Sequence, residues 1–288
     1  MSYRALCTGI NLYKNYPQAT LHGCVNDAHQ MSGILTKFLG FKTTDIVTLT
    51  DAQATKQNIM TNLKTMVADA KKGKISYIVF TMSSHGTQVT DVNHDEPDGL
   101  DEAFCPHDLA QIGNQWDKNH LIVDDELHDL FVTLPQNVLL EVWLDTCHSG
   151  TGLRTIDLLL DRNPKFLTPS VEAFERQEQS GLTRTLTTML RTTRLVKNLP
   201  NQILWAACKD VQTSADAYIN GDWHGAFTWY FCQEITKCNN KLSRNQVLAN
   251  VRTDLVKAKF TQTPQLECPA TDKNAALATI SEEAAALV

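Results

Sequence analysis

Strand-like and helix-like patterns alternate along most of this 288-residue chain, and that alternation constrains the fold more than any other feature. The segment 75–82 (ISYIVFTM) is a nearly continuous apolar run, which is typical of a strand covered on both faces of a parallel sheet. The expected strands span 4–12, 46–49, 75–82, 138–145, 202–208 and 265–268, and the expected helices span 25–39, 56–72, 124–134, 225–238 and 243–259. Right-handed crossovers between such strands predict an α/β fold with a three-layer, doubly wound, mostly parallel sheet.

Residues 151–200 interrupt this alternation. The stretch is rich in Thr, Arg, Gln and Ser, contains Pro164 and Pro169, and has only weak periodicity. Such a composition is typical of a long exposed linker. We therefore expect a single domain over residues 1–288, with a large part at 1–150, the linker at 151–200 and a small part at 201–280.

The composition argues against several classes of protein. The formal net charge is −6 and there is no basic stripe, so we expect no nucleic-acid partner. No run reaches the ~20 apolar residues of a membrane span, and the first residues lack the pattern of a secretory signal. We therefore expect a cytoplasmic protein. In that reducing compartment its eight cysteines should be free thiols, and a zinc ribbon is disfavoured because no two of them have the Cys-x-x-Cys spacing.

Two predicted strands end in residues that can carry chemistry. The first runs into Ser83, Ser84, His85 and Gly86, and the second into Asp145-Thr146-Cys147-His148-Ser149-Gly150. Ligands of a doubly wound sheet bind beyond the carboxyl ends of its strands. A histidine there can activate a cysteine thiol for attack on a carbonyl carbon. On spacing alone, a loop histidine and a packed core thiol remain the more common outcome, since nine His and eight Cys offer many such pairs.

Seven short motifs stand in one order between about residues 3 and 240. They are HGCVND (22–27), TMSSHGTQ (81–88), DGLDEAFCPHD (98–108), IVDDEL (122–127), LDTCHSGT (144–151), WAACKDVQTSADA (205–217) and GAFT (225–228). In this combination the chain resembles the metacaspases and orthocaspases, a family of caspase-like cysteine peptidases. Spacing alone left open whether His85 and Cys147 are a catalytic pair or a loop histidine and a core thiol, and the resemblance favours the catalytic pair.

The resemblance implies a caspase-like fold and a Cys/His dyad that hydrolyses peptide bonds of polypeptide substrates. Cys147 would be the nucleophile and His85 its base. The backbone N–H groups of Gly86 and Cys147 would stabilise the oxyanion. No third member of a triad is evident from the sequence. The family resemblance also favours a monomer.

A pocket for a basic side chain follows from two arguments. Residues two apart in a strand share a face, so Asp145 should point to the side of Cys147. The resemblance assigns four residues to the pocket that accepts Arg or Lys before the scissile bond: Cys24, Asp27, Ser83 and Asp145. Two carboxylates suit a guanidinium or an ammonium group and repel the aspartate that animal caspases prefer. The alternative for Asp27 is a simple helix-entry cap.

The sequence departs from the family at the calcium site. Calcium-dependent metacaspases use four aspartates, and three have counterparts here, at Asp101, Asp124 and Asp125. The fourth position holds Arg154, a cation in the place of an oxygen ligand. We therefore expect a vestigial site and activity without calcium. A calcium-activated metacaspase is the alternative.

A second acidic segment, Asp91–Glu102, has the ligand spacing of an EF-hand loop. Glu96 stands where such a loop needs glycine, and the segment follows a strand rather than a helix. A solvated acidic loop is therefore expected. Cys105 and His107 alone are weak evidence for a zinc site, and we expect neither a metal nor another cofactor.

The linker offers basic residues to an acidic pocket in the same chain. We expect a zymogen that cleaves itself there, with Arg176, Arg184, Arg191 and Arg194 as the candidate sites. The alternative of another class is a catalytically silent caspase-like scaffold that binds partners. The presence of both dyad residues and all pocket residues favours the enzyme.

Overall fold

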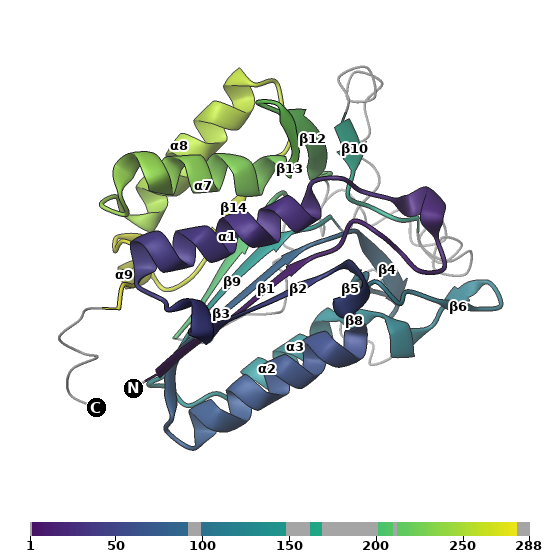
Figure 1. The fold of residues 1–288 in the computed structure, drawn as a ribbon, viewed down its shortest axis with the longest axis horizontal. Helices are drawn as coiled ribbons and strands as arrows, with labels where there is room; N and C mark the ends of the chain where they lie inside the picture. Colours follow the sequence, from purple (N-terminus) through teal and green to yellow (C-terminus); the bar gives the residue numbers. More distant parts are fainter. Residues whose placement is uncertain (1, 92–98, 148–161, 169–200, 210–211, 281–288) are drawn as a thin grey trace.

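A six-stranded sheet forms the centre of the molecule in a computed structural model, which describes residues 2–91, 99–147, 162–168, 201–209 and 212–280 (Figure 1). The strand order is β14-β11-β9-β3-β1-β2, and all neighbours are parallel except β14 and β11. The strands are β1 (Ser2–Gly9), β2 (Ile46–Thr50), β3 (Ile75–Ser83), β9 (Leu139–Asp145), β11 (Gln202–Ala206) and β14 (Gln265–Glu267). The predicted doubly wound, mostly parallel sheet is confirmed.

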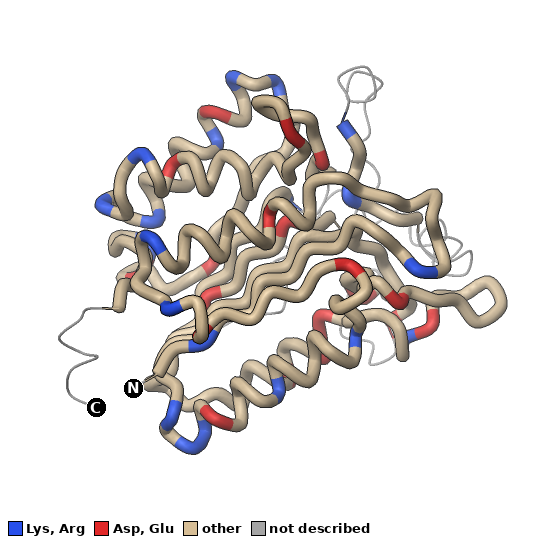
Figure 2. The backbone as a smooth tube through the Cα atoms, in the orientation of Figure 1, with Lys and Arg blue, Asp and Glu red and all other residues tan. Residues whose placement is uncertain are grey.

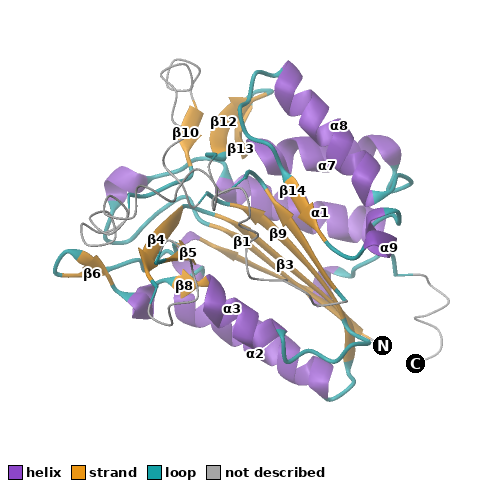
Figure 3. Ribbon diagram, turned by 180° about the vertical axis from the view of Figure 1, so that it is seen from behind, coloured by secondary structure: helices purple, strands orange, loops and turns teal. Residues whose placement is uncertain are grey.

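Helices cover both faces of the sheet and complete the three layers (Figures 1 and 3). One face carries α1 (Cys24–Leu39), α7 (Ala226–Cys238) and α8 (Arg244–Lys257), and the other carries α2 (Lys56–Lys71) and α3 (Asp124–Phe131); the short α9 is Ala270–Lys273. Thr55 caps α2 by accepting a hydrogen bond from the Asn58 N–H group. Gly40 ends α1 in the left-handed region, at φ 82°, which suits a residue without Cβ.

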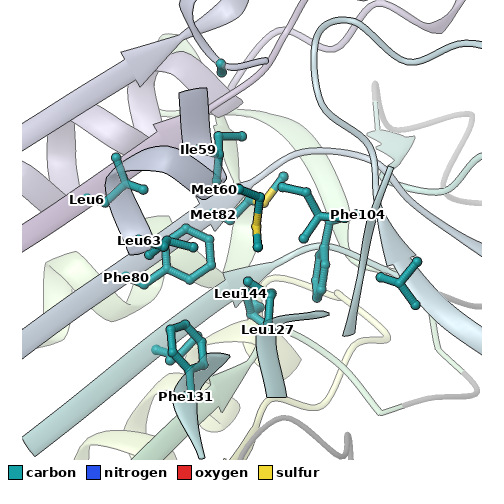
Figure 4. Close-up of a cluster of buried hydrophobic side chains, with 14 of the residues drawn as sticks. Leu6, Ile59, Met60, Leu63, Phe80, Met82, Phe104, Leu127, Phe131 and Leu144 are labelled. Carbon is teal, nitrogen blue, oxygen red and sulfur yellow. The ribbon is translucent and has the colours of Figure 1, made fainter. Parts of the chain in front are cut away.

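The two helix layers enclose two apolar cores. Alternate strand residues face opposite sides, so Phe80 packs toward α2 and α3 whereas Val79 packs toward α1 and α7. Figure 4 shows the first core, where Phe80, Met82 and Leu144 lie among side chains of α2 and α3. Burying each such side chain contributes about 1.5–3 kcal/mol. The charged residues lie mainly on helices and loops, and the central strands carry few of them (Figure 2).

A buried charge pair ties α8 to the middle of the sheet. Glu141 in β9 is fully buried and accepts hydrogen bonds from Arg244 Nε at 2.9 Å and from Tyr77 Oη at 2.9 Å. Trp205 Nε1 donates a further hydrogen bond at 3.0 Å. Because a buried carboxylate needs such partners, this network fixes the position of α8 relative to β9.

Smaller sheets extend the fold beyond the carboxyl ends of the central strands. They contain β4 (Gly86–Thr90), β5 (Leu100–Phe104) and β8 (Ile122–Val123); β6 (Gln111–Ile112) and β7 (Gln115–Trp116); and β10 (Arg162–Pro164), β12 (Ala215–Ile219) and β13 (Asp222–Gly225). Short 3-10 helices lie at Pro17–Ala19, Thr43–Asp45, Asp51–Gln53 and Lys118–His120. These additions, which the sequence patterns did not predict, surround the site.

The expectation of an exposed linker is wrong for Arg162 and Lys165, the two buried residues of the described segment 162–168. Lys165 is fully buried and Arg162 is only 8% exposed. The rest of 151–200 lies outside the described residues. In the part of the chain that the structure describes, no helix is long and apolar enough to cross a membrane.

Candidate active site

His85 and Cys147 lie at the same edge of the sheet. Strands β3 and β9 are parallel neighbours, and Ser83 pairs with Asp145 in their register. His85 and Cys147 follow this pair by two residues each, just past the carboxyl ends of the strands. The predicted meeting of these two segments is therefore present in the fold.

The imidazole of His85 is held by a backbone carbonyl group. Its Nε2 lies 2.8 Å from the carbonyl oxygen of Ala19. A carbonyl oxygen only accepts, so Nε2 carries the proton and Nδ1 is the free base of the neutral ring. No hydrogen bond of ordinary geometry reaches the buried Nδ1 from the described residues. The Ala19 carbonyl thus fixes the tautomer and the orientation of the imidazole ring.

Burial keeps His85 neutral. The pKa of His85 is lowered to about 4, mainly by burial and in part by the charge of Lys165, whereas the backbone groups of Ala19 and Lys165 oppose the shift. The ring is therefore uncharged at neutral pH and can accept a proton at Nδ1. The neighbouring Tyr13 hydroxyl accepts a hydrogen bond from the His85 N–H group at 2.8 Å.

The thiol of Cys147 is fully buried and points to a carbonyl oxygen. Its Sγ donates to the carbonyl oxygen of Gln212 at 2.8 Å. A thiol that donates a hydrogen bond is protonated. The thiolate therefore forms only when a base removes that proton.

Three of the four predicted pocket residues, Asp27, Ser83 and Asp145, contact the ammonium group of Lys165. Its Nζ lies 3.1 Å from Asp27 Oδ2 and 3.1 Å from Asp145 Oδ1, and it donates to Ser83 Oγ at 2.8 Å. Burial raises the pKa of the Cys24 thiol, and the charge of Lys165 opposes this shift. Burial alone would lower the pKa of Lys165, but the charges of Asp145 and Asp27 raise it well above its usual value.

Hydrogen bonds orient both carboxylates toward the ammonium group. Asp145 accepts from Ser214 Oγ at 2.6 Å and from the N–H and hydroxyl groups of Thr228 at 2.9 and 2.7 Å. Asp27 accepts from the N–H group of Gly225 at 2.9 Å, and a Cβ atom at Gly225 would collide with both carboxylates.

The carboxyl group of Asp27 titrates above its ordinary range. Burial raises the pKa of Asp27 to about 6, against the lowering effect of Lys165. The group is therefore mostly ionised at neutral pH and loses its charge in mildly acidic solution. Asp27 is thus a charged lining residue of the pocket, and its role exceeds that of a helix-entry cap.

The backbone of Lys165 is bound as closely as its side chain. Its N–H group donates to the carbonyl oxygen of Ser214 at 3.0 Å, and its carbonyl oxygen accepts from the N–H group of Gly86 at 3.0 Å. One residue later, the N–H group of Leu167 donates to the Gly86 carbonyl at 2.9 Å. Strand β10, just before Lys165, pairs antiparallel with β12. The segment thus runs extended past the site, with the Lys165 carbonyl on the N–H group predicted to stabilise an oxyanion.

Sequence reasoning missed Lys165, Ser214, Thr228 and the Ala19 carbonyl. Ser214 and Thr228 belong to the motifs at 205–217 and 225–228, so those motifs carried a signal for the pocket. Lys165 stood in the apparent linker and carried none. The candidate cleavage sites at 176, 184, 191 and 194 lie outside the described residues, as does Arg154.

The three predicted calcium-site aspartates lie on β5 and in the first turn of α3. An ammonium group reaches this cluster, since Lys118 Nζ lies 3.4 Å from Asp101 Oδ2 and donates to the Thr90 carbonyl at 2.9 Å. Burial raises the pKa of Asp101 to about 6, although Lys118 opposes the shift. No group of three His, Cys, Asp or Glu residues suited to a metal ion occurs among the described residues.

Comparison with known proteins shows which family this chain resembles in sequence. A family model for the metacaspase, peptidase C14 domain matches residues 3–156. Metacaspase-1 of Botryotinia fuckeliana is 34% identical over 294 residues, covering 92% of this chain and 67% of that relative. This chain belongs to the metacaspase family. Metacaspase-1A of Aspergillus fumigatus is also 34% identical, with 68% of its length covered, and 61% of Metacaspase-1 from Coccidioides immitis is covered.

Solved structures support the fold expected of a metacaspase. A Geobacter sulfurreducens protein superposes with a TM-score of 0.66 at 22% identity, covering 97% of this chain and 99% of its own. Caspase-1 from Spodoptera frugiperda superposes with a TM-score of 0.56 at 12% identity, covering 92% and 88%. The predicted caspase-like fold is confirmed, and the metacaspase family assignment makes the chain a cysteine-type peptidase that acts on polypeptides.

Proposed function

We propose that this chain cleaves peptide bonds after lysine or arginine, with Cys147 as nucleophile and His85 as base. The observation that carries the proposal is the binding of Lys165. Its ammonium group lies between Asp27 and Asp145, while its carbonyl oxygen accepts from Gly86 N–H. A lysine held by side chain and backbone at once is arranged as a substrate residue would be.

The residues around Lys165 support a definite sequence of steps. The Cys147 thiol leaves the Gln212 carbonyl, gives its proton to Nδ1 of His85 and attacks the carbonyl carbon. The N–H groups of Gly86 and Cys147 stabilise the oxyanion that forms. The C–N bond then breaks as His85 returns the proton to the leaving amine. Water hydrolyses the thioester, which frees a carboxylate and restores the thiol.

Matched fluorogenic peptides ending in Arg, Lys or Asp test this proposal. With EDTA present, we expect cleavage after Arg and Lys and none after Asp, because Asp would add a third carboxylate to the pocket. Cys147→Ala should lose at least roughly 10³-fold in kcat/KM, whereas Cys238→Ala, the same change away from the site, should not. Cleavage after Asp would overturn the pocket, and equal activity in Cys147→Ala would overturn the nucleophile.

We further propose that the chain cuts itself between Lys165 and Phe166. The geometry around Lys165 favours this bond over those that follow the four arginines at 176, 184, 191 and 194. The cut would separate a large part ending at Lys165 from a small part that contains 201–280. The uncut chain would be a zymogen, because the segment 162–167 fills the substrate position.

We also propose that activity does not require calcium. The ammonium group of Lys118 already supplies a positive charge beside Asp101, and it is tethered by the Thr90 carbonyl. A divalent cation would have to displace it. Arg154 stands at the fourth ligand position of the family pattern and adds a second cation to the sequence there.

Peptide hydrolysis in EDTA and in millimolar Ca²⁺ checks this expectation. Wild type should hydrolyse an Arg peptide at rates that agree within about twofold in both conditions, and Ca²⁺ should leave Tm unchanged, because binding to the folded state would raise it. The Lys118→Arg variant, which keeps the positive charge, should show the same calcium-independent rates as wild type. Activity that appears only with Ca²⁺ would contradict the proposal.

A further inference from the structure

Arg162 occupies a second binding site for a basic side chain. It lies three residues before Lys165, in strand β10, and only 8% of it is exposed. Its guanidinium donates to the carbonyl oxygen of Lys259 at 2.7 Å and to that of Ala258 at 2.8 Å. The guanidinium carbon lies 3.8 Å from the centre of the Phe260 ring. Two acceptors and an aromatic face thus contact one guanidinium.

The end of α8 is suited to this ligand. The last carbonyl groups of a helix lack intrahelical partners and lie at the negative end of its dipole. Lys259 adopts the left-handed conformation, at φ 62°, where the chain turns from the helix into Phe260. A planar guanidinium can donate to both carbonyl groups and stack on the ring together, whereas an ammonium group is a single compact charge.

This site belongs to the same groove as the lysine pocket. Arg162 pairs with Ala217 and Pro164 with Ala215 in the antiparallel register of β10 and β12. The opposite wall comes from the segment after α8, where Gln262 Oε1 accepts from the Ala215 N–H group at 3.1 Å. Phe260, Thr261 and Gln262 line one pocket with residues 162–164 and 213–215. A substrate that replaced residues 162–165 would therefore place its own side chain on Phe260.

We propose that the carbonyl groups of Ala258 and Lys259 and the ring of Phe260 form a specificity subsite. It selects arginine three residues before the scissile lysine or arginine, so the preferred substrates have the form Arg-x-x-Lys or Arg-x-x-Arg. The inference rests on the proposed cleavage after basic residues and adds a second recognition element to it. Phe260 is then a specificity-determining residue.

Four fluorogenic tetrapeptides test the subsite: Arg-Asn-Pro-Lys and its variants with Lys, citrulline or norleucine in the first position. The self-cleaved enzyme should prefer the Arg peptide to the norleucine peptide by about 10- to 100-fold in kcat/KM. Citrulline keeps hydrogen-bond donors but lacks the charge, so kcat/KM of the citrulline peptide should lie between the values of the Arg and norleucine peptides. The retained segment competes equally with every peptide, so the ratios are unaffected by it.

Phe260→Leu should reduce the preference for Arg over norleucine by roughly 3- to 30-fold, while hydrolysis of the norleucine peptide stays within about twofold. Phe38→Leu, which removes a ring from α1, is the matched control and should keep the preference. Equal hydrolysis of all four peptides by wild type would overturn the subsite while leaving cleavage after Lys intact, even if Phe260→Leu failed to fold. No hydrolysis of any peptide would overturn both proposals.

Discussion

Lys165→Gln should leave the chain whole under conditions in which wild type is cut between Lys165 and Phe166. Glutamine carries no charge to pair with Asp27 and Asp145, so the two buried carboxylates would lose their cation. Breaking a buried pair in this way costs about 3–5 kcal/mol. Because about 1.4 kcal/mol corresponds to a factor of ten, cutting at this bond should slow by roughly 10²- to 10³-fold.

Denaturing gels and sequencing of the new amino terminus measure this effect. Wild type should yield a fragment that begins Phe166-Leu167-Thr168. Lys165→Arg, which keeps the charge, should be cut at the same bond, and Cys147→Ala should not be cut. Wild-type cutting that occurred only after an arginine at 176, 184, 191 or 194 would move the processing site. Unchanged cutting of Lys165→Gln after residue 165 would contradict the pocket.

Asp145→Asn should remove most of the preference for a basic residue before the scissile bond. Asn has nearly the same shape but no charge, and its amide group faces the donors of Ser214 and Thr228, which suit an oxygen. Losing one partner of a buried charge pair costs about 2–5 kcal/mol. We therefore expect kcat/KM for Arg peptides to fall by roughly 30-fold or more.

The informative readout is a ratio of two kcat/KM values: that of a peptide with Arg before the scissile bond, divided by that of a peptide with norleucine in the same position. Asp145→Asn should lower this ratio, because norleucine does not use the carboxylate. Asp222→Asn makes the same change at an exposed residue of β13 and should leave the ratio as in wild type. An equal loss for both peptides would mean that Asp145 supports the fold or the dyad instead of selecting charge.

The central layers could be predicted because their residues repeat with a clear period. The segment 75–82 is buried on both faces, which gives a continuous apolar run, and the β3 that results spans Ile75–Ser83. The smaller sheets carry weaker signals. Strand β8 has only two residues, and β5 buries Asp101 and Glu102, so neither length nor polarity marks them as strands.

The site could be predicted where chemistry follows a strand end, and not where it depends on distant parts of the chain. His85, Cys147 and Asp145 stand directly after or at the ends of buried strands. Lys165 is a single lysine in a polar stretch, and its acidic partner Asp27 lies 138 positions away in sequence. The Ala19 carbonyl that orients His85 is a backbone group, which every residue has, so no residue type reveals it.

The order of strands in the central sheet decides what a cut after Lys165 produces. Strand β11, from the later part of the chain, lies between β9 and β14 and pairs with β9 over five residues, Gln202–Ala206. The Arg244–Glu141 pair spans the same boundary. The two fragments would thus remain one cooperative folding unit and stay together as a two-chain complex. Removing the second fragment would expose the unpaired edge of β9, and an exposed strand edge promotes aggregation. Neither fragment would therefore be stable on its own.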